Sequence, residues 1–270
     1  MFTKLLAYEI RSRFRADARS FGAFIVTIAV ASGIVAAGLP GISGSTAVLS
    51  YALCALTPVA CAIAAMADYW KTLYGQRGYF TMSLPISGAA IFWAKITRMV
   101  IECLLALALA VGGIIAVASA AAWSDGISLA EYTAGPRSVA AGLPTSTVVI
   151  MIVAQVIVAL SWLVQGSAVM SIGAQGRFNH LGFGAPIIGF VLVYIVNQVL
   201  STVGTFFVPL SVTTDGHFST EIMWTSYRAM LGTDGHPNVI GIGSYVLVPL
   251  FALAMGLWAS HSIEKHTSLR

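Results

Sequence analysis

The chain has 270 residues, and only 9% of them are Asp, Glu, Lys or Arg, against about 25% in an average soluble protein. Hydrophobic types make up 58% of the residues and the mean hydropathy is +0.87, which is more apolar surface than one globular core of this size buries. These values exclude an ordinary water-facing domain and predict a membrane protein. The net charge of +4 indicates no nucleic-acid partner, because the basic residues do not gather on one soluble face.

Residues 4–19 separate apolar and basic side chains into two stripes of a predicted helix. Such a helix lies in the membrane interface, against anionic lipid headgroups. A plain basic flank that only sets the topology is the alternative. The apolar stripe consists of Leu5, Leu6, Ile10 and Phe14, and the basic stripe of Lys4, Arg11, Arg13 and Arg15.

Six apolar runs are long enough to cross a bilayer core of about 30 Å, which takes about 20 helical residues. They lie approximately at residues 21–39, 46–67, 97–122, 147–172, 185–208 and 239–260. The predicted fold class is all-α, a polytopic membrane protein with six transmembrane helices. Its predicted parts are an interfacial segment 1–20, a transmembrane domain 21–260 and a tail 261–270. We expect the first segment to be retained, because no small-x-small processing site closes a short apolar region.

The basic residues predict the orientation of these spans. Both termini are expected in the cytoplasm, because cytoplasmic loops carry an excess of Lys and Arg. The basic residues of the opposite loops are only Arg137 and Arg228. The expected cytoplasmic side holds the other twelve of the fourteen basic residues: Lys4, Arg11, Arg13, Arg15, Arg19, Lys71, Arg77, Lys95, Arg98, Arg177, Lys265 and Arg270.

A G-x-S-G pattern at residues 41–44 superficially resembles the nucleophile motif of rhomboid-type intramembrane proteases. Such an enzyme needs a His within hydrogen-bond reach of the serine, here Ser43. The candidate His261 is expected at the opposite side of the membrane. We therefore interpret residues 41–44 as a turn and predict no catalytic residues.

Glu102 is the one ionisable residue that we expect within a span, close to its cytoplasmic end. Arg98 lies four residues earlier, which is the spacing of an ion pair on one helix face. We therefore interpret the two residues as a local pair rather than as part of a proton pathway.

Uncharged polar side chains in the fourth and fifth spans have two open interpretations. Gln155 and Gln165 lie in the fourth span, and Asn197 and Gln198 in the fifth. These four residues either join helices by hydrogen bonds or line a translocation path. They are our candidates for that path.

The outer loop before the sixth span contains the sequence TDGH twice. Asp215 and His217 in the first copy, with Asp234 and His236 in the second, are weak candidates for a metal site. Asp-Gly is foremost a turn signal, so two turns and no metal are the preferred interpretation. Between the copies, the spacing of Trp224, Tyr227, Arg228 and Leu231 predicts a short interfacial helix.

The chain contains no G-x-x-x-x-G-K-[ST] pattern, and so no P-loop for nucleotide phosphates. Any ATP-driven function would therefore need a separate ATPase subunit. We expect no cofactor on this chain, with ATP and Mg bound by that partner.

The loop after the second span reads LYGQRGYFTMSLPIS over residues 73–87 and continues to Lys95. It resembles the G-Y-x-x-x-x-L-P-[IV]-S…K stretch of bacterial ABC transporter permeases of the ABC-2 (exporter) type. The opening sequence KLLAYEIRSRFR and the six-span layout are similar to the same family over essentially the whole chain. The loop departs from the family pattern at Arg77, where such loops often carry an acidic residue.

The resemblance implies that this loop carries a short cytoplasmic helix that sits in a cleft of the ATPase subunit. Its residue types agree, because aromatic and Arg side chains anchor protein interfaces. A loop that rests its aromatic side chains on lipid headgroups is the alternative. The candidate coupling residues are Tyr74, Arg77, Tyr79, Phe80 and Leu84.

The function that the resemblance implies is the permease subunit of an ATP-driven exporter in the bacterial cytoplasmic membrane. Its expected partners are an ABC ATPase, a second copy of this permease or a related permease, and membrane lipids. The transported compound would be an amphiphilic drug, peptide or lipid-like molecule. A non-transport accessory or sensor protein that docks a soluble partner is the alternative, and an intramembrane hydrolase is a distant third.

Overall fold

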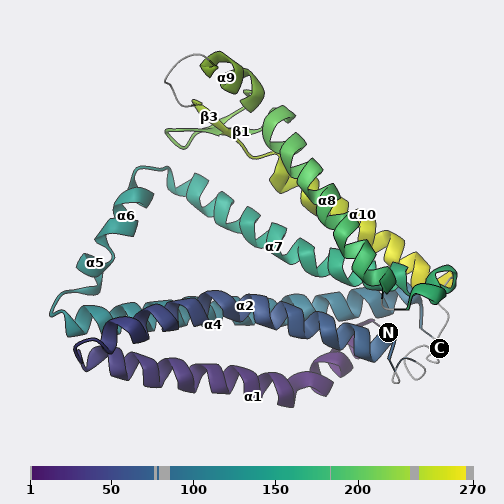
Figure 1. Ribbon diagram of the computed structural model, residues 1–270, viewed down its shortest axis with the longest axis horizontal. Helices are drawn as coiled ribbons and strands as arrows, with labels where there is room; N and C mark the ends of the chain where they lie inside the picture. The colour runs from purple at the N-terminus through teal and green to yellow at the C-terminus, as the bar shows by residue number, and fades with distance from the viewer. Residues whose placement is uncertain (1, 76–77, 79–85, 183, 232–236, 266–270) are drawn as a thin grey trace. The chain divides into compact units, whose positions relative to one another are not determined.

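The computed structural model describes residues 2–75, 78, 86–182, 184–231 and 237–265. Six helices in this part of the chain are long and apolar enough to cross a membrane. This finding confirms the prediction of a helical, multi-pass membrane protein, while its orientation stays a prediction. The six are α1 (Phe2–Ala36), α2 (Ser43–Leu73), α4 (Gly88–Ser124), α7 (Thr145–Gly173), α8 (Gly184–Phe207) and α10 (Ser244–Lys265) (Figure 1).

The chain folds as two compact units. The first consists of Met1–Ile86 and Trp93–Arg137, and the second of Ser87–Phe92 and Ser138–Arg270. Each unit has its own three long helices and its own buried residues.

In the first unit, α1, α2 and α4 pack around an apolar core. Ile28 of α1, Cys54 of α2, and Ala110 and Val117 of α4 form this core. Gly113 of α4 lets the helices approach closely, because a Cβ atom there would lie 2.7 Å from the Sγ atom of Cys54. The short helices α5 (Leu129–Tyr132) and α6 (Ala134–Ala141) follow α4.

The predicted interfacial segment and the first span form one uninterrupted helix, α1. Its 35 residues extend over about 52 Å at 1.5 Å per residue, well beyond the hydrocarbon core of a bilayer. The helix ends before Gly38, which takes a left-handed φ of 62°, a conformation that glycine adopts without steric cost. Which part of α1 lies in the interface stays a prediction.

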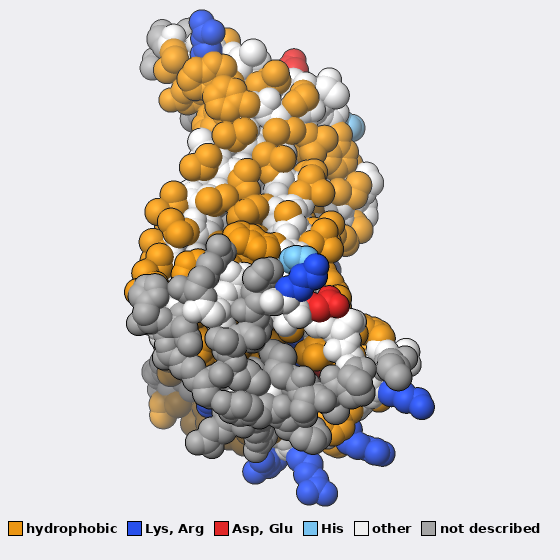
Figure 2. All heavy atoms as spheres, turned by 90° about the vertical axis from the view of Figure 1, so that its right-hand side faces the viewer, with side chains coloured by type: hydrophobic (Ala, Val, Ile, Leu, Met, Phe, Trp, Pro, Cys, Tyr) orange, Lys and Arg blue, Asp and Glu red, His pale blue; other side chains and the backbone are white. Residues whose placement is uncertain are grey.

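In the second unit, α10 packs against α7 and α8, and its small residues Ala252, Gly256 and Ser260 are all buried. The 3₁₀ helix η1 (Gly176–Leu181) connects the end of α7 to the start of α8. Figure 2 shows hydrophobic side chains over much of this unit, in the upper part of the view. Ile187, Val191 and Val199 of α8 are large apolar residues that are exposed, which favours a lipid environment over water.

The structure is largely helical, in agreement with the predicted all-α class, and adds one small antiparallel sheet between α8 and α10 in the sequence. Its strands β1 (Ser211–Thr213), β2 (Phe218–Ser219) and β3 (Val239–Gly241) lie in the order β2-β1-β3. The helix α9 (Met223–Met230) lies in the expected place of the short helix, and its Trp224 contacts Phe206 and Phe207 at the end of α8.

The sixth span is present, but it begins a few residues later than predicted, because residues 239–241 form β3 and α10 begins at Ser244. The cause is the close approach of this segment to the end of α8. A Cβ atom on Gly241 would collide with the carbonyl oxygen of Thr205, and one on Gly243 with that of Gly204. Only glycines let the two backbones pass at this distance, and the valine and isoleucine before them suit a strand.

Two neighbouring glycines of α4 provide a test of the first unit's packing. We expect Gly113→Ala to lower stability by about 1–3 kcal/mol, because its methyl group overlaps Cys54. Gly112→Ala is the matched control, since nothing lies within 4 Å of the added Cβ atom. The thermal unfolding of both variants in the same detergent measures the difference. Equal transitions for the two variants would contradict the close approach of α2 and α4.

Candidate functional site

The predicted coupling loop lies between α2 and α4, and both flanking helices belong to the part that the structure describes. Of the five predicted coupling residues, Tyr74 is described, and Arg77, Tyr79, Phe80 and Leu84 lie outside the described residues. The ring of Tyr74 packs 5.2 Å from that of Trp70 and 6.4 Å from that of Tyr69, measured between ring centroids. These aromatic contacts hold the start of the loop against the end of α2.

Lys95, shortly after the loop, is almost completely buried, with 2% of its surface exposed. Its Nζ atom donates a hydrogen bond of 2.8 Å to Oε1 of Glu9 on α1, and one of 3.0 Å to Oγ1 of Thr72 on α2. One ammonium group therefore joins three helices. A buried ammonium is stable only when partners of this kind replace its water.

Arg98 lies one turn further along α4 and is 1% exposed. Its two terminal nitrogens donate to Oδ2 of Asp68 at 3.0 Å and to Oε1 of Glu102 at 2.6 Å. The Nε atom lies 3.8 Å from Oε2 of Glu9, which is an ion pair without a hydrogen bond. The structure thus confirms the predicted pair of Arg98 and Glu102 and adds Asp68 and Glu9 to it.

Arg13 extends this arrangement along α1. Its guanidinium donates to Oδ1 of Asp68 at 3.2 Å and lies 3.8 Å from Oδ1 of Asp17. We call the whole set the charged cluster. It consists of Glu9, Arg13, Asp17, Asp68, Lys95, Arg98 and Glu102.

The other predicted interfacial cations, Lys4, Arg11 and Arg15, are exposed on α1. Figure 2 shows Lys and Arg side chains along the lower edge of the view, where Figure 1 places α1. Leu5 of the predicted apolar stripe is buried, whereas Ile10 and Phe14 are exposed. The packed face of the segment therefore combines Leu5 with Glu9, and the segment still presents cations and apolar side chains outward.

The charged cluster fastens α1 to both helices that flank the loop. Asp68 and Thr72 lie in the last turns of α2, and Lys95 and Arg98 lie in the first turns of α4. Removing one partner of a buried ion pair costs about 3–5 kcal/mol, so sliding these helices apart would be expensive. The three helix ends are thus expected to move together.

Sequence reasoning found only one pair of the charged cluster. Arg98 and Glu102 are four residues apart on one helix, whereas Lys95 and Glu9 are 86 residues apart and Arg98 and Asp68 are 30 apart. Long-range partners of this kind leave no periodic signal in a single sequence. The one local indication of the larger cluster was Glu9, an acidic residue one helical turn after the apolar Leu5 and so on the same helix face.

The structure brings together two of the four polar residues that were candidates for a translocation path. Gln165 and Asn197 exchange hydrogen bonds of 2.6 and 3.3 Å, and Gln165 also donates to the carbonyl of Val248 at 3.4 Å. Both amides are buried, so they join α7, α8 and α10 in this conformation. Gln155 accepts a hydrogen bond from Tyr245 instead, and Gln198 donates to Tyr194 on an exposed face of α8.

The first TDGH copy forms the turn between β1 and β2. Gly216 takes a φ of 80°, and its amide donates to the carbonyl of Thr213. Asp234 and His236 lie outside the described residues. In the described part of the chain, no three His, Cys, Asp or Glu residues lie close enough to hold a metal ion. The preference for two turns over a metal site that includes Asp215 and His217 therefore stays a prediction.

The G-x-S-G segment forms a turn that leads into α2. Gly41 takes a φ of 76°, and the hydroxyl of Ser43 donates to the carbonyl of Leu39 at 3.0 Å. This local hydrogen bond agrees with the interpretation of the segment as a turn.

Comparisons with protein-family models, with curated proteins and with solved structures give no match to this chain. The resemblance to the ABC-2 exporter type therefore stays a prediction from the loop residues 73–87, the opening sequence and the six-span layout.

The charged cluster predicts that replacing either of two lysines near the loop changes stability to a different extent. We expect Lys95→Met to lower the free energy of unfolding by about 3–5 kcal/mol, because the buried Glu9 loses its hydrogen-bonded cation and keeps only the ion pair with Arg98 at 3.8 Å. Lys71→Met, at an exposed position of α2, should change it by less than about 0.5 kcal/mol. Unfolding titrations in mixed micelles measure both values.

The double variant Glu9→Gln with Lys95→Met adds a second check. It should recover part of the loss, because no buried charge then lacks its partner. If the double variant loses as much as both single changes added together, the two side chains are not coupled.

The hydrogen-bonded amides of Gln165 and Asn197 also predict that a double variant is more stable than the two single losses would suggest. Gln165→Leu alone should lower stability by about 1 kcal/mol, and the double variant with Asn197→Leu should restore most of it. Unfolding in detergent measures the effect. Full additivity of the two losses would argue against a role in joining the helices.

Proposed function

We propose that this chain is the permease subunit of an ATP-driven exporter, and that the loop between α2 and α4 couples it to a separate ABC ATPase. The exporter would act in the bacterial cytoplasmic membrane, with both termini of the chain in the cytoplasm. ATP and Mg would bind to the partner, and this chain would supply no catalytic residue. The support is the loop sequence at residues 73–87 together with the helical multi-pass architecture.

The charged cluster is the observation that carries the coupling. A loop transmits force only if its two ends are attached to something stiff. Here Lys95, 11 residues after Leu84 in the sequence, is bonded both to α2 and to α1. A push from the ATPase on the loop would therefore move the ends of α1, α2 and α4 as one body rather than deform a single helix.

α2 also contains a position at which the helix would bend during such a movement. Pro58 lies inside this helix, and proline removes one backbone hydrogen bond and clashes with the carbonyl four residues earlier. It separates the half of α2 that carries Asp68 from the half that packs Cys54 into the core. We propose that the half carrying Asp68 tilts relative to the packed half between inward- and outward-facing states.

Six spans are half of the complement usual for exporters of this type, so we propose that a second permease completes the pore. That second subunit is either another copy of this chain or a related permease. The transported compound would be amphiphilic, a drug, peptide or lipid-like molecule.

The test is co-expression with candidate ABC ATPases, purification in detergent and measurement of ATP hydrolysis in the recovered complex. Tyr79→Asp and Leu84→Asp should each remove the ATPase from the complex, because a carboxylate in a buried apolar contact is costly. Both variants should still insert in the membrane. If they keep the complex and its ATP hydrolysis, the coupling loop is assigned wrongly.

The conservative variant Glu9→Gln separates coupling from docking. It keeps the loop intact, so the ATPase should remain bound, but transport per ATP hydrolysed should fall by about tenfold as the attachment of α1 weakens. Arg11→Gln, an exposed neighbour on α1, is the matched control and should behave as the unmodified chain. Equal coupling in both variants would remove the charged cluster from the mechanism.

A further inference from the structure

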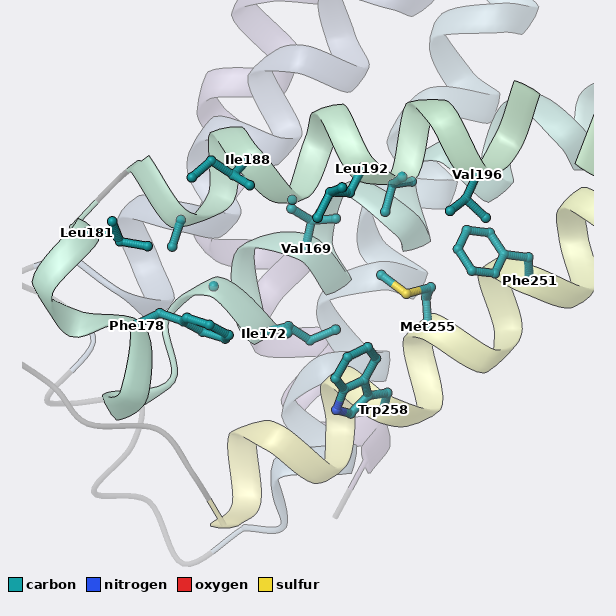
Figure 3. Close-up of a pocket in the computed structure, with 14 residues that line it drawn as sticks. Val169, Ile172, Phe178, Leu181, Ile188, Leu192, Val196, Phe251, Met255 and Trp258 are labelled. Carbon is teal, nitrogen blue, oxygen red and sulfur yellow. The ribbon is translucent and has the colours of Figure 1, made fainter. Parts of the chain in front are cut away.

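The second unit contains an apolar groove. None of its lining residues belongs to the predicted coupling loop or to the charged cluster. Its volume is about 410 Å³, and its lining comes from α7, η1, α8 and α10. Figure 3 shows Phe178 and Leu181 of η1 at one end, and Val196 and Phe251 at the other. Every lining residue is apolar or glycine.

We propose that this groove binds one acyl chain of a glycerophospholipid, from the membrane leaflet on the side of the chain's C-terminus, with the lipid phosphate beside Lys265. The inference concerns a bound membrane lipid and does not depend on the proposed transport activity.

The shape of the groove selects a single hydrocarbon chain. Along α8 the lining extends from Ala185 to Val196, which is about 16 Å at 1.5 Å per residue. A helix about 10 Å wide occupies roughly 1,300 Å³ over this length, which is more than the groove holds, so a helix of another subunit does not fit inside. A single hydrocarbon chain, in contact with the walls at carbon distances of about 4 Å, fits along it.

The groove is narrow because glycine brings its walls together. A Cβ atom on Gly189 of α8 would lie 2.7 Å from Cγ1 of Val169 on α7, so only glycine allows this approach. A chain inside the groove then has protein carbon on several sides. In lipid this matters, because the hydrophobic effect gives no gain there and binding depends on the number of close contacts.

The composition of the lining also points to a hydrocarbon tail. Binding sites for polar ligands carry a few placed polar groups, and here none of the lining residues is charged or an amide. The recognition of a head group must therefore occur beyond the groove. Trp258 lines it and is half-exposed, as is usual for indole rings near a membrane interface.

The positive charge of Lys265 indicates where the lipid phosphate lies. Lys265 lies seven residues after Trp258 on α10 and so shares its face of the helix. It is exposed and is the last residue of the helix, three residues after Ser262, whose hydroxyl accepts a hydrogen bond from Gln175 next to η1. A tail between α8 and α10 that passes Trp258 would bring an anionic phosphate to this ammonium group.

The test uses the full chain in nanodiscs that contain a trace of phospholipid with a diazirine near the end of one acyl chain. After illumination and digestion, mass spectrometry should find cross-links concentrated on the groove residues Leu192, Met255 and Trp258. Ile188→Trp should reduce these cross-links by about tenfold, because its indole occupies the groove. Ile187→Trp is the matched control, since Ile187 and Ile188 are 54% and 52% exposed and only Ile188 lines the groove.

Two results of this experiment would overturn the acyl-chain site. Cross-links spread evenly over the exposed faces of α1, α2 and α8 would mean ordinary surrounding lipid. Protein-to-protein cross-links from Leu192→Cys, with the groove protected from the lipid probe, would mean that a second copy covers it.

The phosphate position is tested with a diacylglycerol that carries the same diazirine chain. The unmodified chain should prefer the phospholipid by about fivefold, the effect expected of one lysine near a phosphate. Lys265→Gln should abolish that preference while the acyl chain still labels the groove. An unchanged preference in this variant would refute the assignment to Lys265.

Discussion

The burial of Lys95 and Arg98 constrains the whole first unit. Two cations removed from water each require carboxylates within hydrogen-bond distance, and this chain has only ten acidic residues. Glu9, Asp68 and Glu102 meet the requirement from three different helices. Because these side chains must reach one place, the register of α1 against α2 and of both against α4 is fixed to within about one helical turn. The packing of the apolar core around Cys54 then follows from that register.

The two units solve the same problem with different chemistry. Lipid gives no hydrophobic drive for helix association, so polar contacts and close packing must hold helices together. The first unit uses ion pairs near one end of its helices. The second unit uses the reciprocal amides of Gln165 and Asn197 and the buried small residues of α10. The ion pairs of the first unit form only when the charged atoms lie within a few ångströms of each other. Such contacts suit a region that transmits force, because they resist relative movement of the helices.

Local patterns in the sequence predicted the helices, because a span needs about 20 consecutive apolar residues and an ion pair on one helix needs a spacing of four. The pair of Arg98 and Glu102 and the turn at Gly216 were visible for the same reason. Lys95 and Glu9, by contrast, meet only through the fold. The strand β3 was missed because residues 239–243 are apolar enough to extend a span, and because its partner β1 is distant in the sequence. Of the predicted coupling residues, Tyr74 alone lies within the described part of the chain.

The uninterrupted length of α1 makes it a lever. Its core contact at Ile28 and its charged contact at Glu9 are 19 residues apart in the sequence, or about 28 Å along the helix. A tilt of about 10° around the core contact would shift the charged end by about 5 Å, which is close to the rise of one helical turn. Because the charged cluster joins this end of α1 to α2 and α4, the ends of all three helices would move by that distance together. A small change of angle at the core contact would thus become a large displacement of the helix ends that flank the loop.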